Sequence, residues 1–108
     1  MSDLKLLGIE ELGKAGGARI VLFFNPERGT CRTFEPRVLE AAGRLGLGEF
    51  LFGVNTAGVE DAAAAFGVPG VPSLALVVDG RPVEWLFGVH PEAVVLETMG
   101  RWKERMGL

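Results

Sequence analysis

Apolar residues along this chain alternate between short unbroken runs and longer helical repeats. Ile20 to Phe24 is an unbroken apolar run rich in β-forming residues, as expected of a strand that is buried on both faces of a sheet. Asn25-Pro26 breaks the run. Beyond it, apolar residues recur at helical spacing between Thr30 and Leu45, at positions 34, 38, 41, 42 and 45. The pattern therefore predicts a buried strand, a loop and a long helix.

The rest of the chain repeats this alternation. Asp79-Gly80, the commonest two-residue hairpin turn, predicts that the strands on either side of it pair antiparallel. Strands are predicted at Leu4–Leu7, Phe50–Val54, Ser73–Val78 and Val83–Phe87. Further helices are predicted at Ile9–Leu12, at Glu60–Phe66 and from His90-Pro91 onward, where Val95, Met99, Trp102 and Met106 form one apolar stripe. We expect an α/β protein whose mixed sheet is covered by helices on both faces.

Length, composition and charge limit what the protein can do. The 108 residues are enough for one core, so residues 1–108 are predicted to form a single domain. A net charge of −3 gives no broad basic surface for a nucleic acid. The first residues lack the apolar core of a secretory signal, and no apolar run has membrane-spanning length. We therefore expect a cytoplasmic protein with neither nucleic acid nor membrane as a partner.

The chain has one cysteine and one histidine, Cys31 and His90. These two residues cannot supply a zinc or copper cluster, and we expect neither a metal site nor a cofactor. A single cysteine also excludes an intramolecular disulfide, so any disulfide must join this chain to a partner. Cys31 falls in the first turn of the long predicted helix, where unpaired backbone N–H groups would stabilise a thiolate.

Several motifs together resemble the thioredoxin family from Ile20 to Trp102. Pro36 follows Cys31 by five residues, as in the redox helix of that family. Residues 67–73 read Gly-Val-Pro-Gly-Val-Pro-Ser, similar to the family's Gly-Ile-x-Gly-Ile-Pro-Thr segment. Asp79-Gly80 and Gly88 fall where the family has a hairpin turn and a groove glycine. The resemblance implies a thioredoxin-like fold with a central mixed sheet of four to five strands, and a cis Pro72 that faces the active-site sulfur.

The active-site loop departs from the family's Trp-Cys-Gly-Pro-Cys pattern. It reads Glu-Arg-Gly-Thr-Cys over residues 27–31, so Arg28 stands where the attacking cysteine belongs and Cys31 corresponds to the resolving one. Glu27 replaces the tryptophan, and Leu22 replaces the buried aspartate that assists proton transfer. Dithiol exchange needs one thiolate to attack and a second thiol to break the mixed disulfide, so this chain alone cannot complete the cycle.

Two functions from different classes follow. In the first, the protein takes part in thiol/disulfide redox homeostasis, and Cys31 forms mixed disulfides with a protein or a small thiol. The Arg28 guanidinium, and Arg32 less directly, would hold either the thiolate or a substrate carboxylate. In the second, a redox-inactive module grips an extended polypeptide in its groove, and Cys31 is an inert core residue. A peroxidatic role for Cys31 is weaker, because Pro26 and Thr30 lack the peroxiredoxin spacing. The candidate groove consists of Glu27, Gly29, Thr30, Gly70, Val71, Pro72 and Gly88.

Overall fold

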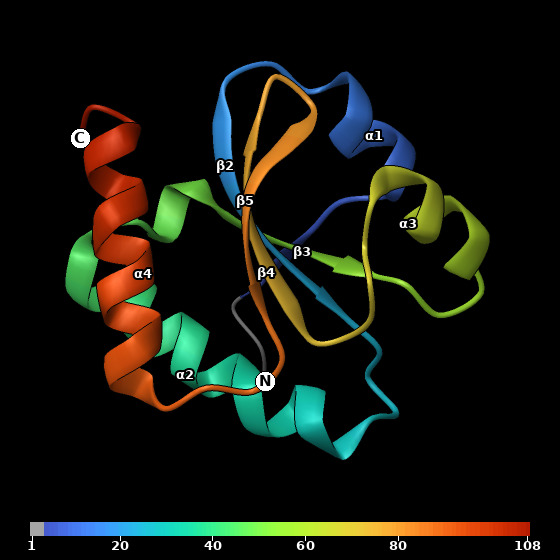
Figure 1. Ribbon diagram of the computed structural model, residues 1–108, viewed down its shortest axis with the longest axis horizontal. Coiled ribbons are helices and arrows are strands. Elements are labelled where there is room, and N and C mark those ends of the chain that lie inside the picture. Colours follow the sequence, from blue (N-terminus) through green and yellow to red (C-terminus); the bar gives the residue numbers. More distant parts are fainter. Residues whose placement is uncertain (1–3) are drawn as a thin grey trace.

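The computed structural model describes residues 4–108, and within them one five-stranded sheet carries helices on both faces (Figure 1). The strands are β1 (Lys5–Leu6), β2 (Ala18–Phe24), β3 (Leu51–Asn55), β4 (Ser73–Val78) and β5 (Arg81–Phe87). The helices are α1 (Ile9–Lys14), α2 (Gly29–Leu45), α3 (Glu60–Phe66) and α4 (Glu92–Arg105), with a short 3₁₀ turn at Gly48–Phe50.

The sheet is mixed, in the order β1-β3-β2-β4-β5. The strand β3 pairs parallel with both β1 and β2, whereas β4 pairs antiparallel with β2 and β5. The predicted strand at Ile20–Phe24 is the buried part of the central strand β2. A strand with neighbours on both sides and helices on both faces has no solvent-facing side, which explains why its sequence is apolar without alternation.

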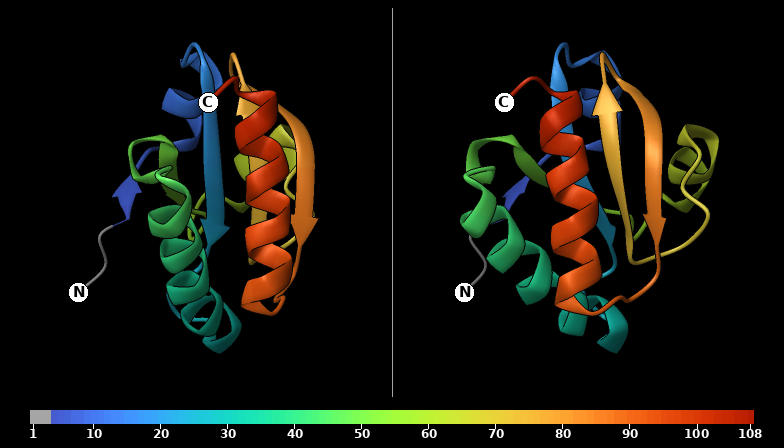
Figure 2. Two further views of the ribbon diagram at one scale, coloured as in Figure 1. Left: turned by 90° about the vertical axis from the view of Figure 1, so that its left-hand side faces the viewer. Right: turned by 60° about the vertical axis from the view of Figure 1, so that its left-hand side comes forward.

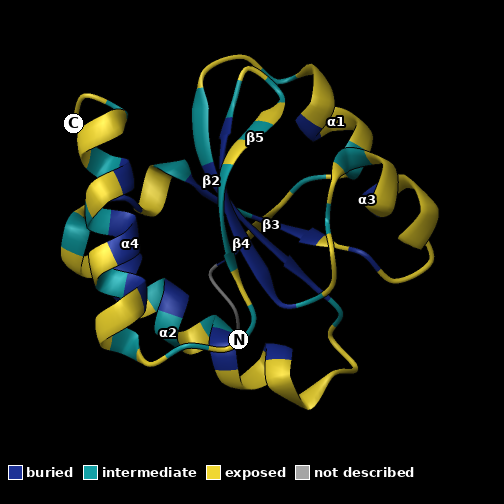
Figure 3. Ribbon diagram, viewed as in Figure 1, coloured by how far each residue is buried: buried dark blue, intermediate teal, exposed yellow. Residues whose placement is uncertain are grey.

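Two apolar clusters lie on opposite faces of the sheet (Figures 2 and 3). The larger one is formed with α2 and α4, and Phe34, Val38, Met99 and Trp102 are fully buried in it. The smaller one is formed with α1 and α3, and includes Leu12 and Phe23. The prediction of an α/β mixed sheet with helices on both faces is confirmed. Of the predicted stripe on α4, Met106 alone is only partly buried.

Element boundaries differ from the predicted ones by a few residues. Phe50 belongs to a separate 3₁₀ turn, Gly48–Phe50, and β3 begins at Leu51. The strand β5 begins at Arg81, directly after the predicted turn. Asp79 and Gly80 have φ values of 49° and 79°, so both turn residues adopt the left-handed conformation that a tight hairpin requires.

Candidate functional site

The loop after β2 is held by a short set of hydrogen bonds. The side-chain Oδ1 of Asn25 accepts the Glu27 N–H at 2.9 Å, and the Asn25 carbonyl accepts the Arg28 N–H at 3.0 Å. The Arg32 guanidinium donates to the Pro26 carbonyl at 3.1 Å. These bonds turn the chain from the end of β2 into α2, whose N-cap residue is Arg28. The path of the backbone from Asn25 to the start of α2 is therefore fixed by these bonds.

Cys31 lies in the first turn of α2, as the sequence predicts, but its side chain belongs to the core. Only 2% of the residue is exposed, and it is part of the apolar cluster that includes Leu22 and Phe34. The Asn25 N–H donates to the Cys31 Sγ at 3.4 Å. The thiol is therefore covered by the loop that precedes the helix, and no partner reaches it unless that loop moves.

The segment before β4 presents free backbone groups. The Val71–Pro72 peptide bond is cis. The Pro72 carbonyl accepts the Gly88 N–H at 2.9 Å, and the Gly70 carbonyl accepts the Ser73 hydroxyl at 2.7 Å. The Val71 N–H and C=O, by contrast, have no hydrogen-bond partner within residues 4–108. Val71 thus carries one unsatisfied donor and one unsatisfied acceptor at the end of the sheet.

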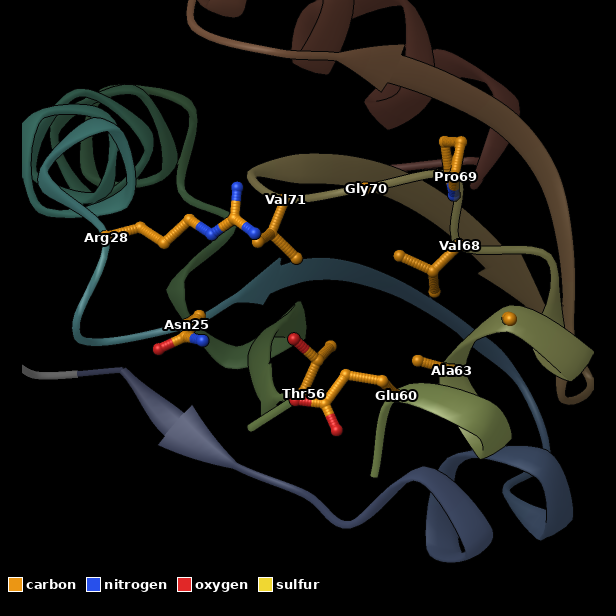
Figure 4. Close-up of a pocket in the computed structure, with 10 residues that line it drawn as sticks. Asn25, Arg28, Thr56, Glu60, Ala63, Val68, Pro69, Gly70 and Val71 are labelled. Atoms are coloured by element: carbon orange, nitrogen blue, oxygen red, sulfur yellow. The ribbon is translucent and has the colours of Figure 1, made fainter. Parts of the chain in front are cut away.

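Two cavities adjoin along the Pro69–Val71 segment, which lines both of them. The cavity of about 280 Å³ lies between the loop after β2, the start of α3 and this segment (Figure 4). We call it the Arg28 cavity, and its walls include Asn25, Arg28, Thr56, Glu60 and Val68. The other, of about 400 Å³, is called the Phe87 cavity and is lined by Pro69, Gly70, Val71, Pro72, Ser73, Phe87 and Gly88.

The Arg28 cavity has a positive charge on one wall and a negative charge on the opposite wall. Figure 4 shows the Arg28 side chain extending from the start of α2 toward Val71. In the described part of the chain its guanidinium has no hydrogen-bond or ion-pair partner. Glu60 lies on the opposite wall, and its pKa is below the usual range because its own backbone N–H and that of Gly58 donate to the carboxylate. The cavity therefore presents one free cation and one ionised carboxylate.

The predicted site residues separate into distinct groups. Gly70, Val71, Pro72 and Gly88 meet at the Phe87 cavity. Arg28 faces the other cavity while Cys31 is buried behind the loop, and the structure shows no hydrogen bond or ion pair joining the two side chains. The remaining three, Glu27, Gly29 and Thr30, are exposed and line neither cavity.

Sequence reasoning missed Phe87, Asn25, Thr56 and Glu60. A signal existed for Thr56 and Glu60: they follow β3, which runs parallel to β2, and the carboxyl ends of parallel neighbours meet at one edge of a sheet. Phe87 gave no such signal, because β5 carries apolar residues on both faces. Its side chain stacks on Trp85 at 5.6 Å between ring centroids and is 54% exposed.

The motifs and this geometry agree with comparisons to known proteins. The family model described as Thioredoxin matches residues 10–101. The chain belongs to the thioredoxin family. Among curated proteins it is similar to a chloroplastic M-type thioredoxin of Chlamydomonas reinhardtii, with 26% identity over 83 residues, or 77% of this chain. The aligned part spans 59% of that relative's length.

Solved thioredoxins share the fold. A thioredoxin of Fasciola hepatica is 27% identical with a TM-score of 0.70, and the match covers 91% of this chain and 98% of that one. A thioredoxin of Nicotiana alata is 17% identical with a TM-score of 0.67, over 94% and 96% of the two chains, and shows the fold alone. The predicted thioredoxin-like fold is confirmed, and this chain carries it with one cysteine.

Two further properties concern residues 4–108. None of the helices in this part is long and apolar enough to cross a membrane. The same residues contain no cluster of three or more His, Cys, Asp or Glu side chains that could hold a metal ion.

Proposed function

We propose that this thioredoxin-family protein binds an extended polypeptide segment beside Val71 and does not run a dithiol cycle. The supporting observation is the pair of unsatisfied Val71 backbone groups next to a cavity. An extended segment satisfies such a pair by strand addition, in which its own C=O and N–H bond to those of the protein. Main-chain contacts tolerate many sequences in the partner.

The Phe87 cavity supplies the side-chain contacts for this segment. Pro72 and Phe87 form apolar walls, and Phe87 as a residue is more than half exposed. An exposed aromatic ring beside free backbone groups is typical of a surface that a partner covers. The partner residue that pairs with Val71 would pack its side chain on this ring.

The residues of the loop after β2 favour peptide binding over catalytic turnover of disulfides. Cys31 is the sole cysteine, and the resemblance to the family motif implies that Arg28 occupies the place of the attacking thiol. A mixed disulfide formed here has no second thiol in the chain to break it. With thioredoxin reductase present, the protein is therefore expected to show no multiple-turnover reduction of a protein disulfide.

Single-thiol redox chemistry at Cys31 is the second candidate function. It is supported by the hydrogen bond from the Asn25 N–H to Sγ and by the position of Cys31 in the first turn of α2. In this reaction the Cys31 thiolate attacks a partner's disulfide, a new S–S bond forms, and the partner's second sulfur leaves as a thiolate. The step requires the loop at residues 25–28 to open, because the thiol is covered.

Binding can be tested with a short, acetylated, fluorescein-labelled peptide of Ser, Thr and Val, followed by fluorescence anisotropy. Phe87→Ser should weaken binding about tenfold, since an apolar contact worth roughly 1–2 kcal/mol is lost. Val83→Ser is the matched control, because Val83 is on the same strand, is 45% exposed and lines neither cavity. Equal binding by wild type and Phe87→Ser, or equal losses in both variants, would contradict the proposal.

A further inference from the structure

We propose that the Arg28 cavity selects extended segments that carry a carboxylate side chain next to the residue paired with Val71. This inference rests on the proposed function and names the class of partner. It is carried by the free Arg28 guanidinium in the cavity wall, together with a second free donor beside it.

The second donor is the side-chain amide of Asn25. Its Oδ1 accepts the Glu27 N–H, which fixes the amide so that Nδ2 turns toward the cavity below Arg28 (Figure 4). Within residues 4–108 the Nδ2 group has no hydrogen-bond partner. A guanidinium and an amide N–H on one wall match the two oxygens of a carboxylate, and charge-assisted bonds of this kind are the stronger ones.

The position of the cavity fits one side chain of a strand paired at Val71. Successive side chains of an extended segment point to opposite sides. The Pro69–Val71 segment lines both the Phe87 cavity and the Arg28 cavity. A strand paired at Val71 would therefore run beside both cavities, with an apolar side chain at the first and its neighbour at the second.

Glu60 on the far wall limits which anions fit. Its carboxylate is held ionised by backbone N–H groups, so it repels any anion in the cavity, and repels most strongly a ligand with more than one negative charge. A single Asp or Glu side chain that stays near Arg28 and Asn25 experiences the smallest repulsion. The cavity volume of about 280 Å³ accommodates one such side chain.

The test uses three forms of the Ser/Thr/Val peptide, in which one residue is replaced by Glu, Gln or Lys. The replaced position is moved along the peptide from one set of three to the next. At one position the Glu peptide should bind wild type about three- to tenfold more tightly than the Gln peptide, with the Lys peptide weakest. Arg28→Gln should abolish the difference between Glu and Gln, and Arg28→Glu should reverse the order so that Lys binds best. Glu60→Gln should strengthen binding of the Glu peptide.

Arg44→Gln is the matched control. It removes the same charge from the same helix, but Arg44 pairs with Glu40 near the other end of α2 and does not line the cavity. It should leave the preference for Glu unchanged. If all three peptides bind equally, or if Arg44→Gln acts like Arg28→Gln, the selection by Arg28 is wrong while binding beside Val71 stands. If the Gln peptide does not bind at all, the proposed function itself fails.

Discussion

The backbone N–H of Asn25 donates to the Sγ of Cys31 at 3.4 Å, so the loop that would expose the thiol is bonded to it. The resemblance to the family's Cys-x-x-Cys motif implies that Cys31 corresponds to the resolving cysteine and Arg28 to the attacking one. In the structure Cys31 is buried in the core, whereas Arg28 lines a cavity.

Native Cys31 should react slowly with iodoacetamide at neutral pH. A side chain that is 2% exposed becomes accessible only when the structure opens locally, so we expect a rate at least about a hundredfold below that of the unfolded protein. The measurement is mass-spectrometric alkylation with and without denaturant.

Arg28→Ala tests whether the alkylation rate of Cys31 depends on burial of the thiol alone or also on Arg28. Because Arg28 has no hydrogen bond or ion pair with Cys31 in the described chain, this variant should alkylate as slowly as wild type. Fast alkylation of the native protein, lowered by Arg28→Ala, would show a reactive thiol that Arg28 supports and would favour the single-thiol redox function.

Arg28→Cys should create a disulfide within the chain. Arg28 is the N-cap of α2, and its carbonyl accepts the Cys31 N–H at 3.1 Å, so the two side chains start from neighbouring positions on one helical turn. Under mild oxidant, the monomer should lose both free thiols.

Arg32→Cys is the control for this disulfide. Residues 31 and 32 are adjacent in α2, and adjacent helical side chains do not face each other. This variant should remain reduced or form dimers. If Arg28→Cys also gives only dimers, the alignment of residues 28–31 with a Cys-x-x-Cys pair is incorrect.

Glu84 links β5 to α4, and its removal should destabilise the fold. Its carboxylate accepts the indole N–H of the buried Trp102 and guanidinium groups of Arg101 and Arg105 at 2.9 Å each. Glu84→Ala leaves the indole donor without its partner. Because the Glu84 side chain is 30% exposed and its ion pairs are partly screened by solvent, we expect a loss of about 1–2 kcal/mol in the free energy of unfolding. Glu40→Ala, at an exposed pair with Arg44, should cost at most about 0.5 kcal/mol.

Glu84 also makes stability depend on pH. The Trp102 indole, followed by Arg101, lowers the pKa of Glu84 in the folded protein below its value in the unfolded chain. Its contribution is therefore complete above the unfolded pKa, about 4.3, and is lost as the pH falls through the lower folded value. Urea titrations from pH 7 to pH 3 should show the wild type converging toward Glu84→Ala; a difference that stays constant would contradict this.

Most of the fold could be predicted from the periodicity of apolar residues, because each strand is short and the residues along it have similar surroundings. Ser73–Val78 and the Asp79-Gly80 turn follow from an unbroken apolar run and a turn that both residues can adopt. The start of β3 was predicted one residue early, since Phe50 is apolar in either a 3₁₀ turn or a strand. Local pattern alone does not separate these two states.

The candidate site was less predictable, because its walls come from segments distant in sequence. Motifs indicated the loop with Cys31 and the Val71-Pro72 segment, but they did not indicate that the thiol would be covered while Arg28 faced a cavity. Glu60 and Phe87 reach the two cavities only through the parallel pairing of β3 and the register of β5. Such proximity depends on tertiary structure that residue spacing does not encode.

The most direct test of binding beside Val71 is an NMR titration of the ¹⁵N-labelled protein with the unlabelled Ser/Thr/Val peptide. The free Val71 N–H should gain a hydrogen bond, so its resonance should shift downfield and its exchange with solvent should slow as peptide is added. Amides near Phe87 should shift with the same dissociation constant, whereas those at Val83 should not. A peptide that binds without affecting Val71, or that shifts the exposed end of β1 at Leu6 instead, would contradict the account.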